Sequence, residues 1–142
     1  MAYKPMYTAN ATVTGEGRQG HGTTDDGRLE VELSVPAGVG GDDGPGTNPE
    51  QLFAVGYGAC FHGALKGVAR KAKTDIEGSS VRAEVTLGKS DEGLDIAVDL
   101  AVTLPGLEQS QAEELVEAAH QMCPYSRATR GNIEVNLSVT TS

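Results

Sequence analysis

The chain has 142 residues, a formal net charge of −9 at pH 7, two cysteines and no tryptophan. This length favours one domain with its own core, which we place over residues 1–142. The negative charge argues against nucleic acid and membrane surfaces as partners. No signal peptide opens the chain and no apolar run approaches the roughly 20 residues that span a bilayer, so we expect a cytoplasmic protein.

The first part of the chain reads as two strands with turns between them. Residues Tyr3 to Thr14 alternate loosely and end in Gly15-Glu16-Gly17, so that Arg18 lies on or just after a turn. Residues Leu29 to Val35 alternate apolar with polar side chains, mostly acidic, which predicts a half-buried strand. A glycine-rich loop over residues 36–47 follows.

The stretch from Asn48 to Lys73 predicts the helix around which the chain is organised. Asn48 can cap this helix, Pro49 suits its first position, and Gln51 can bond back to the cap. The first half is apolar almost all round, which predicts a helix buried on every side. Lysines and an arginine occupy its last turns, where they suit the negative end of the helix dipole.

Cys60 lies in the middle of this helix, in a stripe of small residues. Gly56, Cys60, Gly63 and Gly67 recur at spacings of three and four. A glycine inside a helix costs about 1 kcal/mol relative to alanine, so the stripe predicts close approach of another backbone. Burial would raise the pKa of the Cys60 thiol, and the residue would then need a nearby cation to act as a nucleophile. On residue type alone, packing is the simpler role for a core cysteine.

The middle of the chain predicts an antiparallel hairpin. Val81 to Leu87 alternate apolar with polar side chains, Asp91-Glu92-Gly93 turn the chain, and Leu94 to Leu104 alternate again. Pro105-Gly106 then breaks the second strand.

The last part of the chain predicts a second helix and a final strand. Ser110 and Glu113 form a capping box, Cys123 ends the helix, and residues 133–139 alternate as a strand. The order of elements indicates an α+β fold with antiparallel sheet. One small sheet has difficulty covering a helix that is apolar all round, whereas a dimer with two sheets wrapping a pair of helices can do so.

The cysteines and histidines permit more than one chemistry. Cys123 lies at a helix C-terminus, where the dipole disfavours a thiolate, so it suits a resolving thiol better than an attacking one. His120 and Cys123 have ligand-like spacing, but Cys60 and His62 point to different faces, which makes a zinc site awkward. His62 and His120 are more simply packing or hydrogen-bonding residues, and His21 a loop residue. A non-enzymatic redox sensor stays open.

Two separated motifs carry a family resemblance. The first is Asn48-Pro49-Glu50-Gln51-Leu52-Phe53-Ala54 with Gly56-Tyr57-Gly58-Ala59-Cys60-Phe61. The second is His120-Gln121-Met122-Cys123-Pro124-Tyr125-Ser126 with Arg130-Gly131-Asn132. In order and spacing they resemble the organic hydroperoxide resistance (Ohr) family of the OsmC-like superfamily. The resemblance extends from Tyr7 to Val139, and the Cys-Pro-Tyr-Ser ending favours this branch over the general OsmC branch.

The resemblance implies a thiol-dependent peroxidase that reduces organic hydroperoxides, including those of fatty acids, to alcohols. Cys60 matches the peroxidatic cysteine, which forms a sulfenic acid, and Cys123 the resolving cysteine of a Cys60–Cys123 disulfide. Arg18 matches the arginine that holds the thiolate, and Glu50 the carboxylate that orients it. Without the family, Arg18 would be an ordinary turn residue and Glu50 a charge that complements the helix dipole. A broader OsmC-type peroxidase is the nearest alternative.

The family also implies an assembly and a reductant. Its fold is an intertwined homodimer in which antiparallel sheets wrap two central helices. Its reductant is a dihydrolipoyl group on a lipoylated protein, and no bound cofactor or metal is implied. We therefore expect this chain to be a homodimer that meets organic hydroperoxides and a lipoylated partner.

The spacing of the catalytic candidates suggests how the subunits share a site. Glu50 and Cys60 are ten residues apart, about 15 Å along a straight helix, so one arginine can hardly contact both. We expect Cys60 and Cys123 of one subunit to meet Arg18 and Glu50 of the other. A sharp kink at a glycine within the helix is the alternative. The stretch Gln19-Gly20-His21-Gly22 departs from the family pattern, which leaves the position of Arg18 open.

The remaining candidates concern the substrate pocket. Tyr125 is expected to place a hydroxyl near the arginine–glutamate pair, although packing explains it equally well. Phe53, Phe61, Leu107 and Met122 could line an apolar pocket, while core packing is the simpler role for any one of them.

Overall fold

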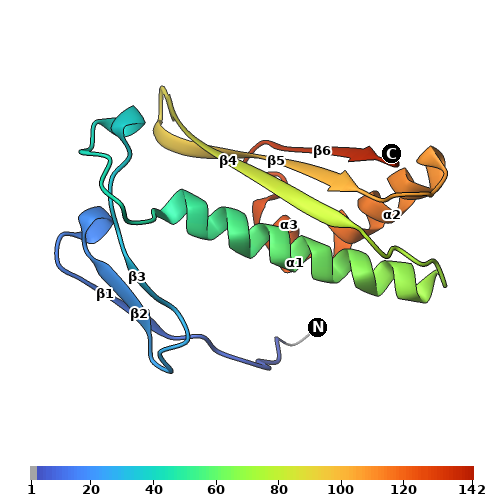
Figure 1. The fold of residues 1–142 in the computed structure, drawn as a ribbon, viewed down its shortest axis with the longest axis horizontal. Coiled ribbons are helices and arrows are strands. Elements are labelled where there is room, and N and C mark those ends of the chain that lie inside the picture. The colour runs from blue at the N-terminus through green and yellow to red at the C-terminus, as the bar shows by residue number, and fades with distance from the viewer. Residues whose placement is uncertain (1–2) are drawn as a thin grey trace. The chain divides into compact units, whose positions relative to one another are not determined.

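The computed structural model describes residues 3–142. The chain forms two compact units, the first ending at Pro49 and the second running from Glu50 to Ser142. Figure 1 shows their elements in chain order. The prediction of a single domain over residues 1–142 stays a prediction. Within the described residues, no helix combines the length and the apolar character needed to cross a membrane.

The first unit is built on a three-stranded antiparallel sheet in the order β1-β2-β3. Its strands and short 3-10 helices are β1 (Ala11–Thr14), η1 (Gly17–Gln19), β2 (His21–Thr24), β3 (Glu30–Glu32) and η2 (Ala37–Val39). The predicted strands over residues 3–14 and 29–35 are therefore too long. Residues 4–10 carry no strand assignment, and Leu33 leaves the ladder for an isolated bridge to Thr47. His21 lies in β2, so its prediction as a loop residue is wrong.

The second unit holds the helices and a second three-stranded sheet, in the order β4-β5-β6. Its elements are α1 (Pro49–Lys71), β4 (Ser80–Ser90), β5 (Gly93–Thr103), α2 (Gln109–Met122), α3 (Pro124–Thr129) and β6 (Val135–Thr140). The hairpin of β4 and β5 is confirmed, and its register closes at Ser90 opposite Gly93. β6 pairs with β5 in parallel, so the expectation of antiparallel pairing throughout is wrong. The two helices between these strands form the crossover that a parallel pair requires.

The core of the second unit lies between its helices and one face of its sheet. Alternate residues of β5 point inward, as a half-buried strand predicts. In Figure 1, α1 runs alongside the sheet. The buried apolar residues are Tyr57, Phe61, Leu65, Ala69, Ile76, Val98, Leu100, Val102, Leu104, Ala112, Leu115, Val116, Ala119 and Cys123.

The central helix begins at Pro49, as predicted, and has basic residues in its last turn. It is not buried on every side within this chain. Only Tyr57, Phe61, Leu65 and Ala69 are buried, at spacings of four residues, while 73% of the surface of Val55 is exposed. The sheet has one apolar face and covers one stripe of the helix. The remaining apolar face of α1 is open in the single chain.

The predicted capping box of the second helix is wrong. α2 begins at Gln109 after Glu108, whose side chain makes no capping bond, so Ser110 lies inside the helix. The Gln109 side chain instead donates to Glu113, at 3.1 Å, and to the Val139 carbonyl of β6, at 3.0 Å. The third helix, α3, was not predicted. It begins directly after Cys123 because Pro124 is well suited to the first position of a helix.

Candidate active site

The two cysteines meet in the second unit. Cys60 comes from the middle of α1, and Cys123 lies between α2 and α3. Their sulfur atoms are 3.5 Å apart and both are free thiols. Cys60 is half-buried, whereas Cys123 has no exposed surface. Because a disulfide bond is about 2.0 Å long, a shift of about 1.5 Å would join the two sulfurs.

The first turn of α3 supplies backbone amides to both sulfurs. The Ser126 amide donates to the Cys123 sulfur at 3.5 Å, so Cys123 caps α3 as well as ending α2. The Tyr125 amide donates to Cys60. Cys123 ends α2, as predicted, and α3 also presents its positive end to the same residue, an influence that the sequence analysis did not include.

The surroundings of Cys60 within the single chain disfavour ionisation of its thiol. Burial is the largest cause that raises its pKa, and the neighbouring Cys123 raises it further. The amide of Tyr125 acts in the opposite direction. The raised pKa agrees with the prediction from the sequence. A buried Cys60 needs a nearby cation before it can be a nucleophile at neutral pH.

A buried polar network lies behind the thiol pair. The Tyr57 hydroxyl is 2.8 Å from the Ser126 hydroxyl and 3.1 Å from that of Thr129, while His120 Nδ1 is 2.8 Å from the Ser126 hydroxyl. These side chains are buried, and the network ties α1, α2 and α3 together. Because hydrogen-bonded buried groups hold a fixed geometry, it fixes the amides that contact the sulfurs.

Sequence reasoning found only part of this network. His120 was expected to pack or form hydrogen bonds, which the bond to Ser126 confirms. The roles of Tyr57 and Thr129 were missed. Their signal in the sequence is weak, because a tyrosine in an apolar helix and a threonine near a predicted turn are common without such partners.

The other histidine of the second unit is also satisfied. His62 Nε2 is 2.9 Å from the Ser79 hydroxyl, as expected for a hydrogen-bonding residue. Burial lowers the pKa of both His62 and His120, which favours their neutral forms. Over residues 3–142, no three His, Cys, Asp or Glu side chains gather in a way that could hold a metal ion.

Tyr125 lies against the glycine stripe of α1. A side-chain carbon built at Gly56 would lie 2.7 Å from the Tyr125 hydroxyl, so Gly56 leaves the space that this ring occupies. The rings of Phe53, Tyr57 and Tyr125 pack together with centroids 5.6–5.8 Å apart. The close approach at Gly56 is therefore made by a tyrosine. At Gly63 nothing lies within 4 Å of the added carbon.

An apolar groove of about 410 Å³ opens at Cys60. It is lined by Cys60, Ala64, Gly67, Val68, Lys71, Met122 and Pro124. Met122 is 63% exposed and forms part of this wall, and its place in a substrate pocket stays a prediction. Phe61 is fully buried in the core, and Phe53 and Leu107 pack against that core.

Arg18 and Glu50 lie on elements that the sequence identified. Arg18 is in η1 of the first unit, and Glu50 is in the first turn of α1. α1 runs without interruption from Pro49 to Lys71, so the ten-residue separation of Glu50 from Cys60 stands. The meeting of Arg18 with Cys60 stays a prediction.

The fold and site define an α+β protein whose two free thiols meet beside an apolar groove. The family of OsmC-like proteins matches residues 40–138 of this chain. The organic hydroperoxide resistance protein of Xanthomonas axonopodis pv. citri is 48% identical over 137 residues, which cover 96% of each chain. OhrB of Bacillus subtilis is 47% identical over 136 residues, covering 94% of this chain and 98% of that protein.

Solved structures agree with these sequence matches. The crystal structure of an organic hydroperoxide resistance protein from Legionella pneumophila superposes with a TM-score of 0.92 at 46% identity. It covers 97% of this chain and 100% of that chain. This protein therefore belongs to the OsmC-like family, in its organic hydroperoxide resistance branch. The resemblance and the OsmC-like α+β fold are confirmed, and the homodimer stays a prediction.

Proposed function

We propose that this protein is a thiol-dependent peroxidase that reduces organic hydroperoxides, including those of fatty acids, to alcohols. Membership of the organic hydroperoxide resistance branch supports a role in resistance to these compounds. The observation that carries the proposal is the 3.5 Å separation of the Cys60 and Cys123 sulfurs beside an apolar groove. Such a groove suits the organic part of a hydroperoxide because burial of apolar surface stabilises binding.

Cys60 is the proposed nucleophile because it is the more exposed of the two thiols. Its thiolate attacks the distal peroxide oxygen, the O–O bond breaks, and the alkoxide takes a proton and leaves as the alcohol. The sulfur keeps the oxygen as a sulfenic acid. The Cys123 sulfur then attacks the Cys60 sulfur, water leaves, and a disulfide forms. Each peroxide is thus reduced by two electrons that the thiol pair supplies.

The thiolate requires stabilisation because burial raises the pKa of Cys60. We assign this role to Arg18, whose guanidinium would hold the thiolate and the developing alkoxide by charge-assisted hydrogen bonds. Glu50 would orient the guanidinium through a bidentate pair. Tyr125 is proposed to shape the site from its position against α1, and Met122 to contact the organic group of the substrate.

The disulfide must be reduced before a second turnover. A dithiol can attack the accessible sulfur and then release itself by closing its own ring disulfide. The half-exposed Cys60 sulfur on an apolar groove suits a dihydrolipoyl arm, which is itself apolar. We therefore propose a lipoylated protein as the partner that supplies electrons, with no bound cofactor in the peroxidase itself.

Steady-state turnover tests the function. We expect rapid consumption of a fatty-acid hydroperoxide with dihydrolipoamide and little with glutathione. Cys60→Ser should lower kcat/KM at least about 10³-fold, because loss of a nucleophile removes the covalent step. Cys123→Ser serves as the matched control. It keeps the attacking thiol, so it should consume about one equivalent of peroxide per subunit before it stalls.

Two outcomes would contradict the proposal. If the wild type consumed peroxide no faster than Cys60→Ser with either reductant, the protein would not be a peroxidase. A disulfide that formed with peroxide but never turned over would instead indicate a redox sensor.

A further inference from the structure

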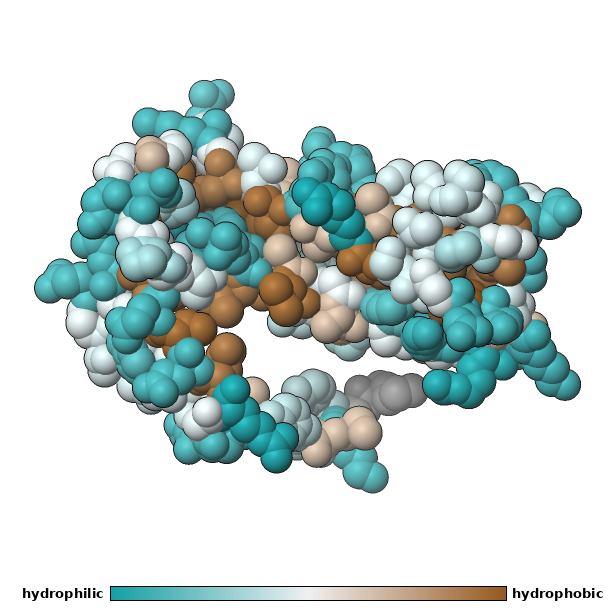
Figure 2. Space-filling view, viewed as in Figure 1, coloured by the Kyte–Doolittle hydropathy of each residue, from teal (hydrophilic) through white to brown (hydrophobic). Residues whose placement is uncertain are grey.

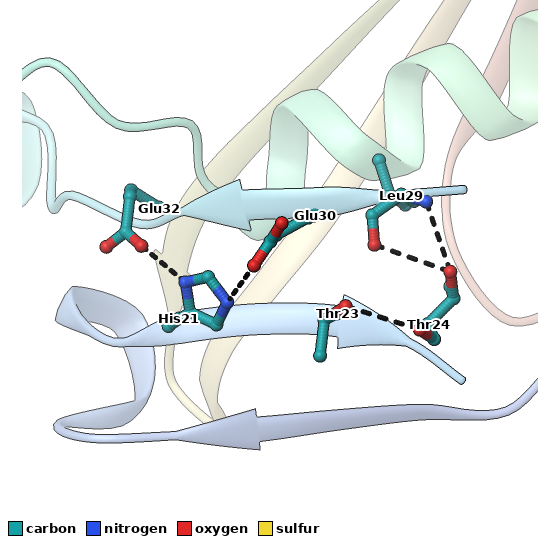
Figure 3. A network of polar contacts seen from close by, with 6 residues as sticks. All are labelled: His21, Thr23, Thr24, Leu29, Glu30 and Glu32. Carbon is teal, nitrogen blue, oxygen red and sulfur yellow. Dashed lines mark hydrogen bonds and ion pairs between the residues drawn. The ribbon is translucent and has the colours of Figure 1, made fainter. Parts of the chain in front are cut away.

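His21 is held between two glutamates of the neighbouring strand. Its Nε2 lies 3.0 Å from a carboxylate oxygen of Glu30, and its Nδ1 bonds to the carboxylate of Glu32 (Figure 3). Glu32 faces His21 directly across the β2–β3 ladder, and Glu30 is the diagonal neighbour two residues away. Only the protonated imidazole has an N–H on both nitrogens, so this arrangement selects the imidazolium.

The surroundings of His21 favour that charge. The hydrogen bond to Glu32 is the largest cause that raises the pKa of His21, and the charges of Glu32 and Glu30 raise it further against partial desolvation. On the other side of β2, the residue opposite His21 is Thr14 of β1, which does not titrate. The charged groups that face this histidine are thus the two glutamates of β3.

His21 is the first residue of β2, directly after the 3-10 turn that carries Arg18. The Gly20 amide donates to the Gly17 carbonyl and the Leu33 amide to the Gly20 carbonyl, both at 2.9 Å. A side-chain carbon at Gly20 would lie 2.0 Å from the Thr14 carbonyl oxygen, so the backbone packs closely there. The turn therefore ends at a tightly packed glycine. The next residue is His21, whose ring contacts both glutamates.

The strands that support this turn are short. β2 has four residues and β3 has three, so few ladder hydrogen bonds hold them together. Cross-strand contacts between side chains therefore contribute a larger part of the stability of this strand pair than they would in a long sheet. Two ion pairs at the first residue of β2 would then decide how well the preceding turn is held.

We propose that His21 is a positioning residue for Arg18: its imidazolium ties the start of β2 to β3 and thereby holds the η1 turn from which Arg18 extends. This inference rests on the proposed function in one respect, which is the role of Arg18 in stabilising the Cys60 thiolate. In this proposal His21 acts through the turn and has no chemical role of its own in the reaction.

The proposal implies a pH dependence with a defined sign. The imidazolium is present below its raised pKa and is lost as the pH rises through that value. The neutral ring has one N–H and can bond only one of the two carboxylates as a donor. The turn should therefore loosen at alkaline pH. Because ionisation of Cys60 also increases as the pH rises, loss of the imidazolium should oppose that gain and give the wild-type rate an alkaline decline.

Five variants test the proposal in the full-length protein. His21→Gln removes the cation and should lower kcat/KM for cumene hydroperoxide about tenfold to a hundredfold near neutral pH, as expected for a misplaced catalytic group. His21→Arg keeps a cation at every pH, so it should retain near-wild-type activity and lose the alkaline decline. Arg18→Ala should be impaired, and His21→Gln combined with Arg18→Ala should be no worse, because both act through one group. His62→Gln, which removes a histidine bonded outside this turn, should keep the wild-type pH profile.

A second measurement is independent of peroxidase activity. Relaxation of the Arg18 Nε–H group by NMR should show greater mobility in His21→Gln than in the wild type and His21→Arg. The proposal is overturned if the mobility of Arg18 is the same in His21→Gln as in the wild type. It is also overturned if the fold-losses in kcat/KM of His21→Gln and Arg18→Ala multiply in the double variant, or if His21→Gln keeps the wild-type pH profile. If the wild type lacked turnover while Arg18 loosened in His21→Gln, the peroxidase assignment would fail and the positioning role would stand.

Discussion

Ser126 is the residue on which the buried polar network converges. Its hydroxyl contacts both the Tyr57 hydroxyl and His120 Nδ1 at 2.8 Å, and its amide donates to the Cys123 sulfur. It has no exposed surface. One side chain therefore links the central helix, the second helix and the thiol pair, which makes Ser126 a structural support of the site.

Replacement of Ser126 by alanine should destabilise the protein. The change leaves the Tyr57 hydroxyl with only Thr129 and leaves His120 Nδ1 without this partner, so we expect a loss of about 2 kcal/mol in the free energy of unfolding. Urea denaturation measures it. Ser79→Ala is the matched control, because Ser79 contacts one half-buried histidine, and its loss should be smaller. Equal losses in the two variants would contradict the importance of the network.

At the scale of elements, α1 presents two different faces. One stripe is buried under the sheet and α2, and Gly56 on another face makes room for Tyr125. Further along, Gly63 and Gly67 would each accept a side-chain carbon with nothing within 4 Å of it. Four glycines in one helix cost stability, and within this chain the close contacts explain only the first part of the stripe. The second part is what a crossing helix of another subunit would require.

Gly63→Ala tests this reading of the stripe. In the single chain the methyl group has space, and alanine should stabilise the helix by about 1 kcal/mol. If a second backbone crosses at this point, the same methyl should instead weaken the dimer, which analytical ultracentrifugation would show as a raised dissociation constant. Gly88→Ala, on β4 with equal space, is the control and should leave assembly unchanged. A more stable protein with unaltered assembly would exclude a helix crossing at Gly63.

At the scale of the whole molecule, much apolar surface is left open by the single chain. Figure 2 shows apolar side chains at the surface of the face in view. The large exposed apolar residues are Tyr3, Met6, Tyr7, Val13, Leu29, Val39, Val55, Leu94, Met122 and Tyr125. In the described part of the first unit, the buried residues are Gly20 and Gly22. A unit with so small a core needs additional cover, which supports the proposed homodimer.

Mixed dimers test how the subunits share the site. If Arg18 and Glu50 serve the cysteines of the other subunit, a dimer of one Cys60→Ser chain and one Arg18→Ala chain contains one complete site. We expect it to recover up to about half of the wild-type activity, since one of two sites is restored. The matched control pairs Arg18→Ala with Glu50→Ala. This dimer has no complete site under the shared arrangement and should stay inactive.

A second control uses the thiol pair itself. Cys60 and Cys123 meet within one chain, so a dimer of Cys60→Ser with Cys123→Ser should not recover turnover. Failure of the first mixed dimer to recover any activity, with assembly verified, would place the whole site within one subunit.

The sequence by itself determined several local elements and the family of the protein. The start of α1 at Pro49 and the β4–β5 hairpin follow from caps, turns and alternation that act over a few residues. The two cysteine motifs were sufficient to identify the family. These features depend on neighbours in the chain, and so a single sequence contains the information that specifies them.

Only the tertiary structure decided which groups surround the thiols. The bond between Tyr57 and Ser126 joins residues 69 positions apart, and the parallel pairing of β6 depends on the path of two helices. α3 is too short to show a period in the sequence, and the pKa of His21 is raised by two glutamates on another strand. Hydrogen bonds and charges act through space, where the fold sets the distances. The family resemblance paired Cys60 with Cys123, whereas the hydrogen-bond partners around them were not readable from the chain.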